Sequence, residues 1–225
     1  IIFFPLFILA QSENYLSDSV YKLSNSDNII EFQKQIIKDR ITASNQALIF
    51  KDGELVFNHI ENSMIKGDQL ITNETIFPIW SMSKPITIVA MMILHEKGLI
   101  DFNDSVSKYI PAFSKPICEN KNGTYPCNSQ LKLIHLMNHR SGYVYYDRYY
   151  VDVIQSKNLE ELMNKIAKQP LQIEPGSKFL YGINQSILGR VIEVVSGKNF
   201  YDFLKDNIFD PLEMNKTKFH LTKDE

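Results

Sequence analysis

Residues 79–98, IWSMSKPITIVAMMILHEKG, place a serine three residues before a lysine at the start of a long apolar run. On a helix, Ser81 and Lys84 would share one face one turn apart, so the amine could activate the hydroxyl. The apolar run predicts a helix that is buried on every side, with Gly98 as its C-terminal stop. Pro85 suits a first helical turn, which puts Ser81 and Lys84 at the helix N-terminus.

The spacing of Ser81 and Lys84 is weak evidence alone, because the chain repeats it at 19–22, 63–66, 105–108 and 129–132. Those copies fall in the polar N-terminal part or in predicted loops, where nothing fixes a nucleophile. Ser81 opens a buried helix, where the dipole and the backbone N–H groups favour a developing negative charge. Ser81 is therefore the candidate nucleophile, its own backbone N–H is a candidate oxyanion donor, and Lys84 is the candidate base.

The composition describes a globular chain: 225 residues, 44% of them hydrophobic, with a net charge of −2. This charge gives no electrostatic footprint for nucleic acid, and no Lys/Arg cluster suggests an anionic membrane surface. The apolar run after Ser81 is shorter than the about 20 residues that a membrane span needs. The sequence has no phosphate loop and no metal-ligand cluster, so we expect no cofactor.

The first ten residues, IIFFPLFILA, resemble the apolar core of a secretory signal and are followed by polar QSENY. A buried strand is the alternative, which Pro5 and the abrupt polar switch disfavour. We expect residues 1–25 to be a signal remnant and a flexible lead, and the protein to be secreted or periplasmic. Export would permit a disulfide between Cys118 and Cys127; free thiols in a cytosolic protein are the alternative.

The rest of the chain divides into an α/β part, 26–78, and a mainly helical part, 79–225. In the first part, an apolar stripe of Ile29, Ile30, Phe32, Ile36 and Ile37 predicts a helix that begins near Ser26 or Asp27. Residues 46–60 predict a β-hairpin with a tight turn at Asp52-Gly53. In the second part, further helices are predicted within 131–142, 158–170, 184–197 and 200–209. The fold class is therefore α+β.

Several blocks in order resemble the serine β-lactamase-like superfamily, in its class C β-lactamase, D,D-peptidase and esterase branch. They are TIFPIWSMSKPITIVAMMILHEKGLIDFNDSVSKYIPAF at 75–113, LKLIHLMNHRSG at 131–142, and GSKFLYGINQSILGRVIEVVSGKNFYDFLKDNIFDPLEMNKTKF at 176–219. The resemblance implies a β-lactamase/transpeptidase-like fold, with a helical domain and a partial antiparallel sheet. It also implies acyl transfer through Ser81, with Lys84 and Tyr181 as partners, on a small ester, amide or lactam.

The chain departs from the family pattern in two places. Tyr181-Gly182-Ile183 lacks the Asn of the lactamase Tyr-x-Asn motif, although Asn184 follows one place late. This favours an esterase or a D-amino peptidase over a β-lactamase. The third motif of the family, Lys-Thr-Gly or His-x-Gly, is missing, so we expect an incomplete chain that lacks the C-terminal strands and has weak activity. A catalytically silent ligand-binding or sensing module is the alternative.

Other candidate groups stay open. Trp80 and the aromatic cluster YVYYDRYY at 143–150 could line an acyl pocket or pack in the core. His135 and His139 have the i, i+4 spacing of a zinc pair, but no third ligand and no catalytic Glu accompany them. We expect no metal there, and the resemblance places His139 in a structural turn.

Overall fold

The computed structural model describes residues 7–9, 23, 25–145 and 148–221. These residues form two compact units, one from Phe7 to Pro78 and one from Ile79 onward. We call them the N-terminal unit and the C-terminal unit. None of the described helices is long and apolar enough to cross a membrane.

The N-terminal unit is built on an antiparallel hairpin of β2 (Asn45–Lys51) and β3 (Glu54–Glu61). Its two-residue turn is Asp52-Gly53, with φ values of 53° and 82°. A type I′ turn, with positive φ at both central positions, matches the twist of the flanking strands, and Asp-Gly accepts that conformation at low cost. The predicted hairpin and its turn are confirmed.

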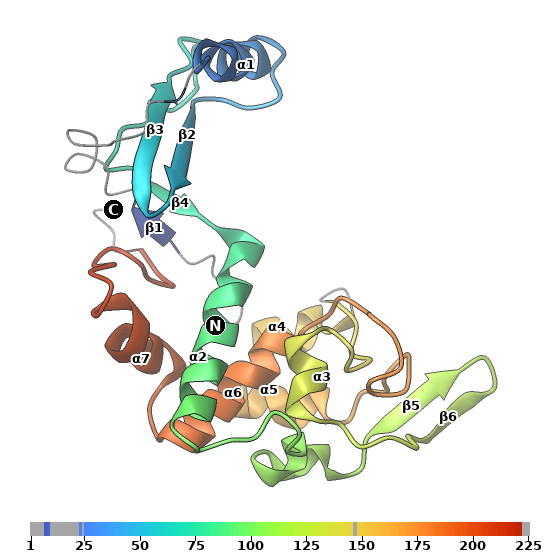
Figure 1. Cartoon of the computed structure of the whole chain (residues 1–225). Coiled ribbons are helices and arrows are strands. Elements are labelled where there is room, and N and C mark those ends of the chain that lie inside the picture. Colours follow the sequence, from blue (N-terminus) through green and yellow to red (C-terminus); the bar gives the residue numbers. More distant parts are fainter. Residues whose placement is uncertain (1–6, 10–22, 24, 146–147, 222–225) are drawn as a thin grey trace. The chain divides into compact units, whose positions relative to one another are not determined.

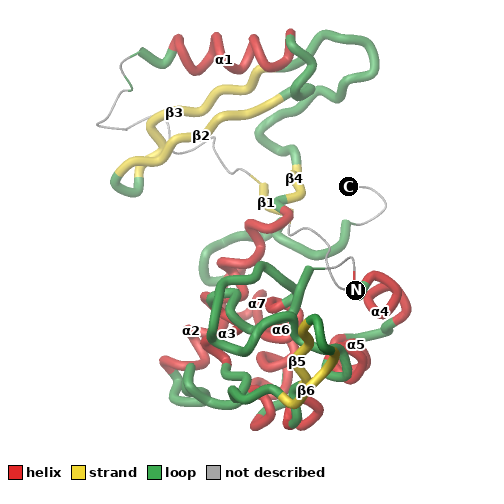
Figure 2. The backbone as a smooth tube through the Cα atoms, turned by 90° about the vertical axis from the view of Figure 1, so that its right-hand side faces the viewer, coloured by secondary structure: helices red, strands yellow, loops and turns green. Residues whose placement is uncertain are grey.

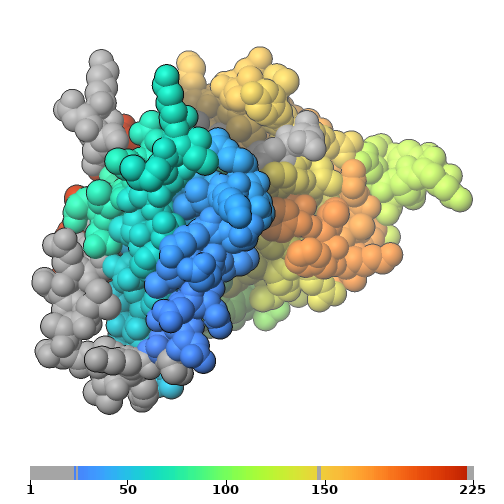
Figure 3. Space-filling model, turned by 90° about the horizontal axis from the view of Figure 1, so that it is seen from above, coloured from blue at the N-terminus to red at the C-terminus, as the bar shows by residue number. Residues whose placement is uncertain are grey.

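Helix α1 (Asp27–Lys38) runs alongside this hairpin (Figures 2 and 3). The predicted apolar stripe is wrong at Phe32, which is 64% exposed, whereas the neighbouring Gln33 is buried. Gln33 Nε2 donates to Asn45 Oδ1 at 2.7 Å, and Gln33 Oε1 lies 3.0 Å from His59 Nδ1. A buried amide is tolerated when both its groups are hydrogen-bonded, and a pattern of apolar residues cannot foresee such a partner.

Strand β1 (Phe7–Leu9) pairs antiparallel with β4 (Ile76–Pro78) in a second small sheet of the N-terminal unit. Residues 1–10 were expected to lie outside the fold, and for 7–9 this is corrected. An apolar run of this length suits a strand as well as the core of a secretory signal. The other leader residues, 1–6, 10–22 and 24, lie outside the described residues.

The C-terminal unit is a helical bundle around α6 (Figure 1). Eight of the 13 residues of α6 are buried, and Gly197 ends the helix with φ 68°, as predicted. The helices that pack on α6 are α2 (Ser83–Glu96), α3 (Leu133–Met137), α5 (Leu159–Ile166) and α7 (Phe200–Leu204), and α6 itself spans Asn184–Ser196. Helix α4 (Tyr150–Gln155) packs on α5.

Helix α2 is buried on one face only. Ala90, Met91 and Leu94 are fully buried, whereas Val89 and Met92 are 44% and 54% exposed. The expectation of a helix buried on every side is therefore corrected. The apolar composition made all faces look alike, but the contact with α6 selects one of them.

A second hairpin, β5 (Ile117–Asn120) and β6 (Gly123–Pro126), projects from the C-terminal unit (Figures 1 and 3). A disulfide joins Cys118 to Cys127 across its base. The backbone N–H of Glu119 donates to Leu171 O at 2.8 Å, and the Leu171 N–H donates to Ile117 O at 2.7 Å. The hairpin is thus held by the disulfide and by backbone bonds to a distant segment.

Candidate active site

The chain enters α2 through a short 3-10 turn, Trp80–Met82. Trp80 has φ +48°, a left-handed conformation that costs a non-glycine residue about 1 kcal/mol or more. The Ser83 hydroxyl donates to Trp80 O at 2.7 Å and fixes this turn. Ser81 therefore lies on the exposed turn just before the helix, and Lys84 lies buried in the first helical turn.

Three side chains meet at the Ser81 hydroxyl, although Tyr181 lies 100 residues further along the chain. Lys84 Nζ donates to Ser81 Oγ at 3.0 Å. The Tyr181 hydroxyl lies 3.0 Å from the same Oγ. Lys84 Nζ also lies 4.9 Å from the centre of the Tyr181 ring, within the range of a cation–π contact. All three residues predicted from the sequence are therefore within direct reach of one another.

The electrostatic setting of Tyr181 differs from that of an ordinary surface tyrosine. Partial burial, the largest influence, raises the pKa of Tyr181, but hydrogen bonds with Lys84 and Ser81 and the charge of Lys84 together outweigh it. The pKa of Tyr181 is therefore lowered from the usual tyrosine value. A phenol beside an ammonium group loses its proton more readily, because the cation stabilises the phenolate.

Two of the other described serine–lysine repeats have structural roles instead. Ser105 Oγ accepts from the Ser107 N–H at 3.3 Å and caps a short turn, and Lys108 Nζ binds Asp104 at 2.8 Å. Ser63, which is buried, donates to Asp68 Oδ2 at 2.5 Å. In neither of these pairs does the lysine reach the serine by a described bond. Context separates them from Ser81.

Tyr181 contacts a network of buried groups behind it. The imidazole of His139 stacks on its ring, with centroids 4.6 Å apart. His139 Nδ1 lies 2.8 Å from Asn184 Nδ2, and Asn184 Oδ1 accepts from Ser141 Oγ at 2.5 Å. Asn184 is fully buried, so it faces this network and not the Ser81 hydroxyl. Ile183, at the third position of the Tyr-x-Asn motif, is also fully buried.

The aromatic cluster at 143–150 divides into core and site residues. Tyr143 and Tyr149 are fully buried, and the Tyr143 ring packs edge-on against Phe113. Tyr145 is 39% exposed, 5.4 Å from the Tyr181 ring and 5.9 Å from Lys84 Nζ. Residues 146–147 lie outside the described part. Among the described residues of the cluster, Tyr145 is thus the one that contacts Tyr181 and Lys84, and the exposed Trp80 directly precedes Ser81.

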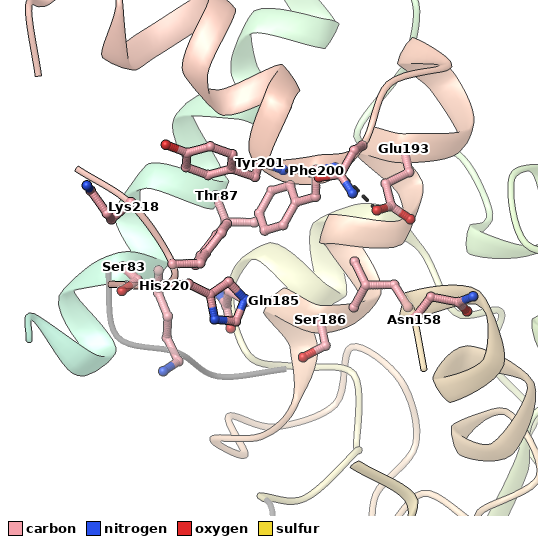
Figure 4. A pocket seen from close by; sticks show the side chains of 14 residues that line it. Ser83, Thr87, Asn158, Gln185, Ser186, Glu193, Phe200, Tyr201, Lys218 and His220 are labelled. Carbon is pink, nitrogen blue, oxygen red and sulfur yellow. Dashed lines mark hydrogen bonds between the residues drawn. The ribbon is translucent and has the colours of Figure 1, made fainter. Parts of the chain in front are cut away.

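A cavity of about 520 Å³ adjoins Lys84 (Figure 4). Its walls come from α2, from α6 and from the start of α7, for example Thr87, Gln185 and Phe200. Gln185 Oε1 and the Ser186 hydroxyl are buried there, and neither has a hydrogen-bond partner among the described residues. A volume of this size is typical of small-molecule sites.

Neither predicted histidine joins a metal-binding group among the described residues. His135 Nδ1 accepts from the Lys132 N–H at 3.3 Å and caps α3, while His139 lies against Tyr181. The described part of the chain contains one group of three side chains whose potential metal-ligating atoms lie close together: Cys118, Cys127 and Glu174. Both of its sulfurs are joined in the disulfide, which removes the thiolates that a metal would need.

The family model described as Beta-lactamase matches residues 32–225. The chain belongs to the Beta-lactamase family. A "Putative D-alanyl-D-alanine carboxypeptidase" of Escherichia coli (strain K12) is 25% identical over 187 residues, which is 77% of this chain and 42% of the relative. A protein of the same description from Salmonella agona is 27% identical over 231 residues, 96% of this chain and 51% of the relative. The chain thus spans about half the length of the curated relatives it matches.

Solved structures place this Beta-lactamase family chain in the β-lactamase/transpeptidase-like fold. "EstCE1, a hydrolase with promiscuous acyltransferase activity" has a TM-score of 0.73 at 23% identity, covering 84% of this chain and 51% of that one. An octameric penicillin-binding protein homologue from Pyrococcus abyssi has a TM-score of 0.71 at 24% identity, covering 85% and 44%. The predicted family and fold class are confirmed. At these levels of identity the two solved structures support the fold and say nothing of the activity.

Sequence reasoning missed the network behind Tyr181. His139 was assigned to a turn, and it does have a left-handed φ of 56°. Its contacts with Tyr181 and Asn184 span more than 40 residues of sequence, which no local pattern encodes. The sequence shows only that α6 begins with three polar residues, Asn184, Gln185 and Ser186, and does not say which of them finds a partner.

Proposed function

We propose that this chain carries the serine nucleophile of a hydrolase that acts on a small ester or amide through a Ser81 acyl-enzyme. One observation carries the proposal: Lys84 Nζ and the Tyr181 hydroxyl both lie 3.0 Å from Ser81 Oγ. A nucleophilic hydroxyl needs a base within hydrogen-bond reach, and here two candidate groups converge on it. An extracytoplasmic location, secreted or periplasmic, is proposed with it, because a disulfide persists in an oxidising compartment.

The reaction has two steps. Tyr181, as phenolate beside the Lys84 ammonium, takes the Ser81 proton while Oγ attacks the carbonyl carbon. The backbone N–H of Ser81, at the start of α2, is a candidate donor to the oxyanion. Collapse breaks the bond to the leaving group, which takes the proton from Tyr181. Water then gives a proton to Tyr181 and attacks the acyl carbon on Ser81. The intermediate collapses, Ser81 Oγ takes the proton from Tyr181, and the acid is released.

The substrate class follows from the surroundings of Ser81. Trp80 is 67% exposed and Tyr145 39% exposed, so aromatic surface borders the hydroxyl. Esterase or D-amino peptidase activity is favoured over lactam hydrolysis, since Ile183 occupies the Asn position of the lactamase motif and is buried.

A fluorophosphonate probe tests the proposal, because it phosphonylates activated serines irreversibly. We expect the full 225-residue chain to be labelled at Ser81, as read by peptide mass spectrometry, and Ser81→Ala to abolish labelling. Ser105→Ala is the matched control, because Ser105 has the same spacing to Lys108 but caps a turn. Labelling that is absent from the wild type, or that persists in Ser81→Ala, contradicts the proposal. A folded but unlabelled chain that still binds ester analogues would favour the silent binding module.

A further inference from the structure

A histidine that takes no part in the proposed reaction lies directly against Tyr181. The imidazole of His139 and the phenol ring are nearly parallel, with an interplanar angle of 24° and centroids 4.6 Å apart. Phe179 meets the imidazole from another direction, at 5.8 Å and 61°. The phenol therefore shares a flat contact with His139, while Tyr145 and Lys84 contact the same phenol ring.

The imidazole is itself fixed in one orientation and one tautomer. The Gly182 N–H donates to His139 Nδ1 at 3.4 Å, and because a backbone N–H cannot accept, Nδ1 must be the acceptor. Asn184 Nδ2 reaches the same nitrogen at 2.8 Å, and Asn184 is held in turn by Ser141. Asn184 and Ser141 are both fully buried, so this support is shielded from water.

We infer that His139 is a positioning residue: its imidazole, held by Gly182 and Asn184, keeps the Tyr181 ring where the phenol oxygen reaches Ser81. The inference rests on the proposed function, because the position of Tyr181 matters only if Ser81 is acylated. The contact has no covalent role, and His139 touches neither Ser81 nor the cleaved bond.

Protonation of His139 in acid should remove the hydrogen bonds that hold its imidazole. A proton on Nδ1 would replace its lone pair and face two N–H donors, which breaks both bonds. Lys84 is the charged group that faces the imidazole through Tyr181, and the neighbouring Arg140 is engaged with Gly176 O. Burial, and secondarily the charge of Lys84, lower the pKa of His139 below the usual histidine value, so the imidazole is neutral at neutral pH.

A matched pair of variants isolates the stacking contact. His139→Phe and His139→Leu both lose the Nδ1 acceptor and both carry a side chain at a left-handed backbone position, φ 56°. They differ in whether a flat ring faces Tyr181. We expect His139→Leu to slow fluorophosphonate labelling by about 10²-fold, the cost of misplacing a catalytic group by about 1 Å. His139→Phe should be labelled at least tenfold faster than His139→Leu.

His135→Leu is the control, because His135 lies one helical turn earlier and caps α3. It should label at the wild-type rate, and thermal unfolding should show the two His139 variants to be equally folded. Equal rates for Phe and Leu at position 139, or wild-type rates in both, overturn the inference. A wild-type chain that is never labelled overturns the proposed function instead, so the two failures are distinguishable.

The pH profile gives a readout that a purely structural role would not move. In the wild type, the logarithm of the labelling rate should fall more steeply only at pH values below the usual histidine pKa, because the pKa of His139 is lowered and the imidazole titrates there in addition to Tyr181. In His139→Phe the extra steepness should vanish. An identical acid profile in both proteins contradicts the role assigned to the imidazole.

Discussion

Gly182, the residue after Tyr181, is the position where one added methyl group should most sharply affect the candidate site. A Cβ there would lie 1.9 Å from the Tyr143 carbonyl oxygen and 2.9 Å from Val144 O. Real Cβ atoms essentially never approach closer than 3.0 Å, so the two backbone segments would have to separate by about 1 Å. Both contacts are with backbone atoms, which cannot rotate away as a side chain would.

The consequence for catalysis follows from how far Tyr181 would move away from Ser81. Moving Tyr181 by this amount would stretch its 3.0 Å bond to Ser81 Oγ beyond hydrogen-bond range. A misplacement of about 1 Å can cost about 10²-fold in rate. We therefore expect Gly182→Ala to slow Ser81 labelling and ester hydrolysis by about two orders of magnitude, measured with a fluorophosphonate and with p-nitrophenyl acetate.

Gly189→Ala is the matched control for Gly182→Ala. Gly189 lies within α6, and its added Cβ would meet side-chain atoms of Leu159 at 3.2 Å and Phe200 at 3.3 Å, which can shift slightly. Alanine also favours a helix over glycine by about 1 kcal/mol. We expect near-wild-type labelling and equal or higher thermal stability. A Gly182→Ala variant that labels within twofold of the wild type would show that the close approach to Tyr143 does not position Tyr181.

Three further changes test separate parts of the molecule. Lys84→Met removes the ammonium that lowers the pKa of Tyr181. The midpoint of the pH–rate profile for labelling should therefore move to higher pH, and an unchanged midpoint would contradict the influence of Lys84 on Tyr181. Gln33→Leu leaves the partners of the buried amide unsatisfied and should cost about 1–3 kcal/mol in urea unfolding, whereas the exposed neighbour Phe32→Ser should cost little. Dithiothreitol, which reduces the disulfide between Cys118 and Cys127, should lower the free energy of unfolding by about 2–3 kcal/mol. The stability of a Cys118→Ser variant should not change with dithiothreitol.

The sequence predicted the features that depend on neighbouring residues. The turn at Asp52-Gly53 and the helix end at Gly197 follow from local backbone preferences, and both were foreseen. The spacing of Ser81 and Lys84 likewise sets their proximity within one helical turn. Tyr181 was identified only through family resemblance, because nothing near it in sequence marks it among 11 tyrosines.

What the sequence could not predict depends on contacts between distant segments. Phe32 and Gln33 are adjacent on α1, and only the position of Asn45 explains why the amide and not the ring is buried. The same holds for His139, whose partner Asn184 lies 45 residues away. Hydrophobic periodicity identifies faces, but it does not reveal which polar group will find a partner there.

The left-handed turn at Trp80 has a practical consequence. The chain contains one tryptophan, and that residue directly precedes Ser81 with 67% of its surface exposed. Indole emission is sensitive to the polarity around the ring, so tryptophan fluorescence, excited at a wavelength that tyrosine does not absorb, reports on the surroundings of this one residue. A bulky acyl or phosphonyl group on Ser81 would shield the indole from water and shift its emission to shorter wavelength. The fluorescence of Trp80 thus reports on the state of Ser81, and stopped-flow mixing could follow acylation in real time without any added label.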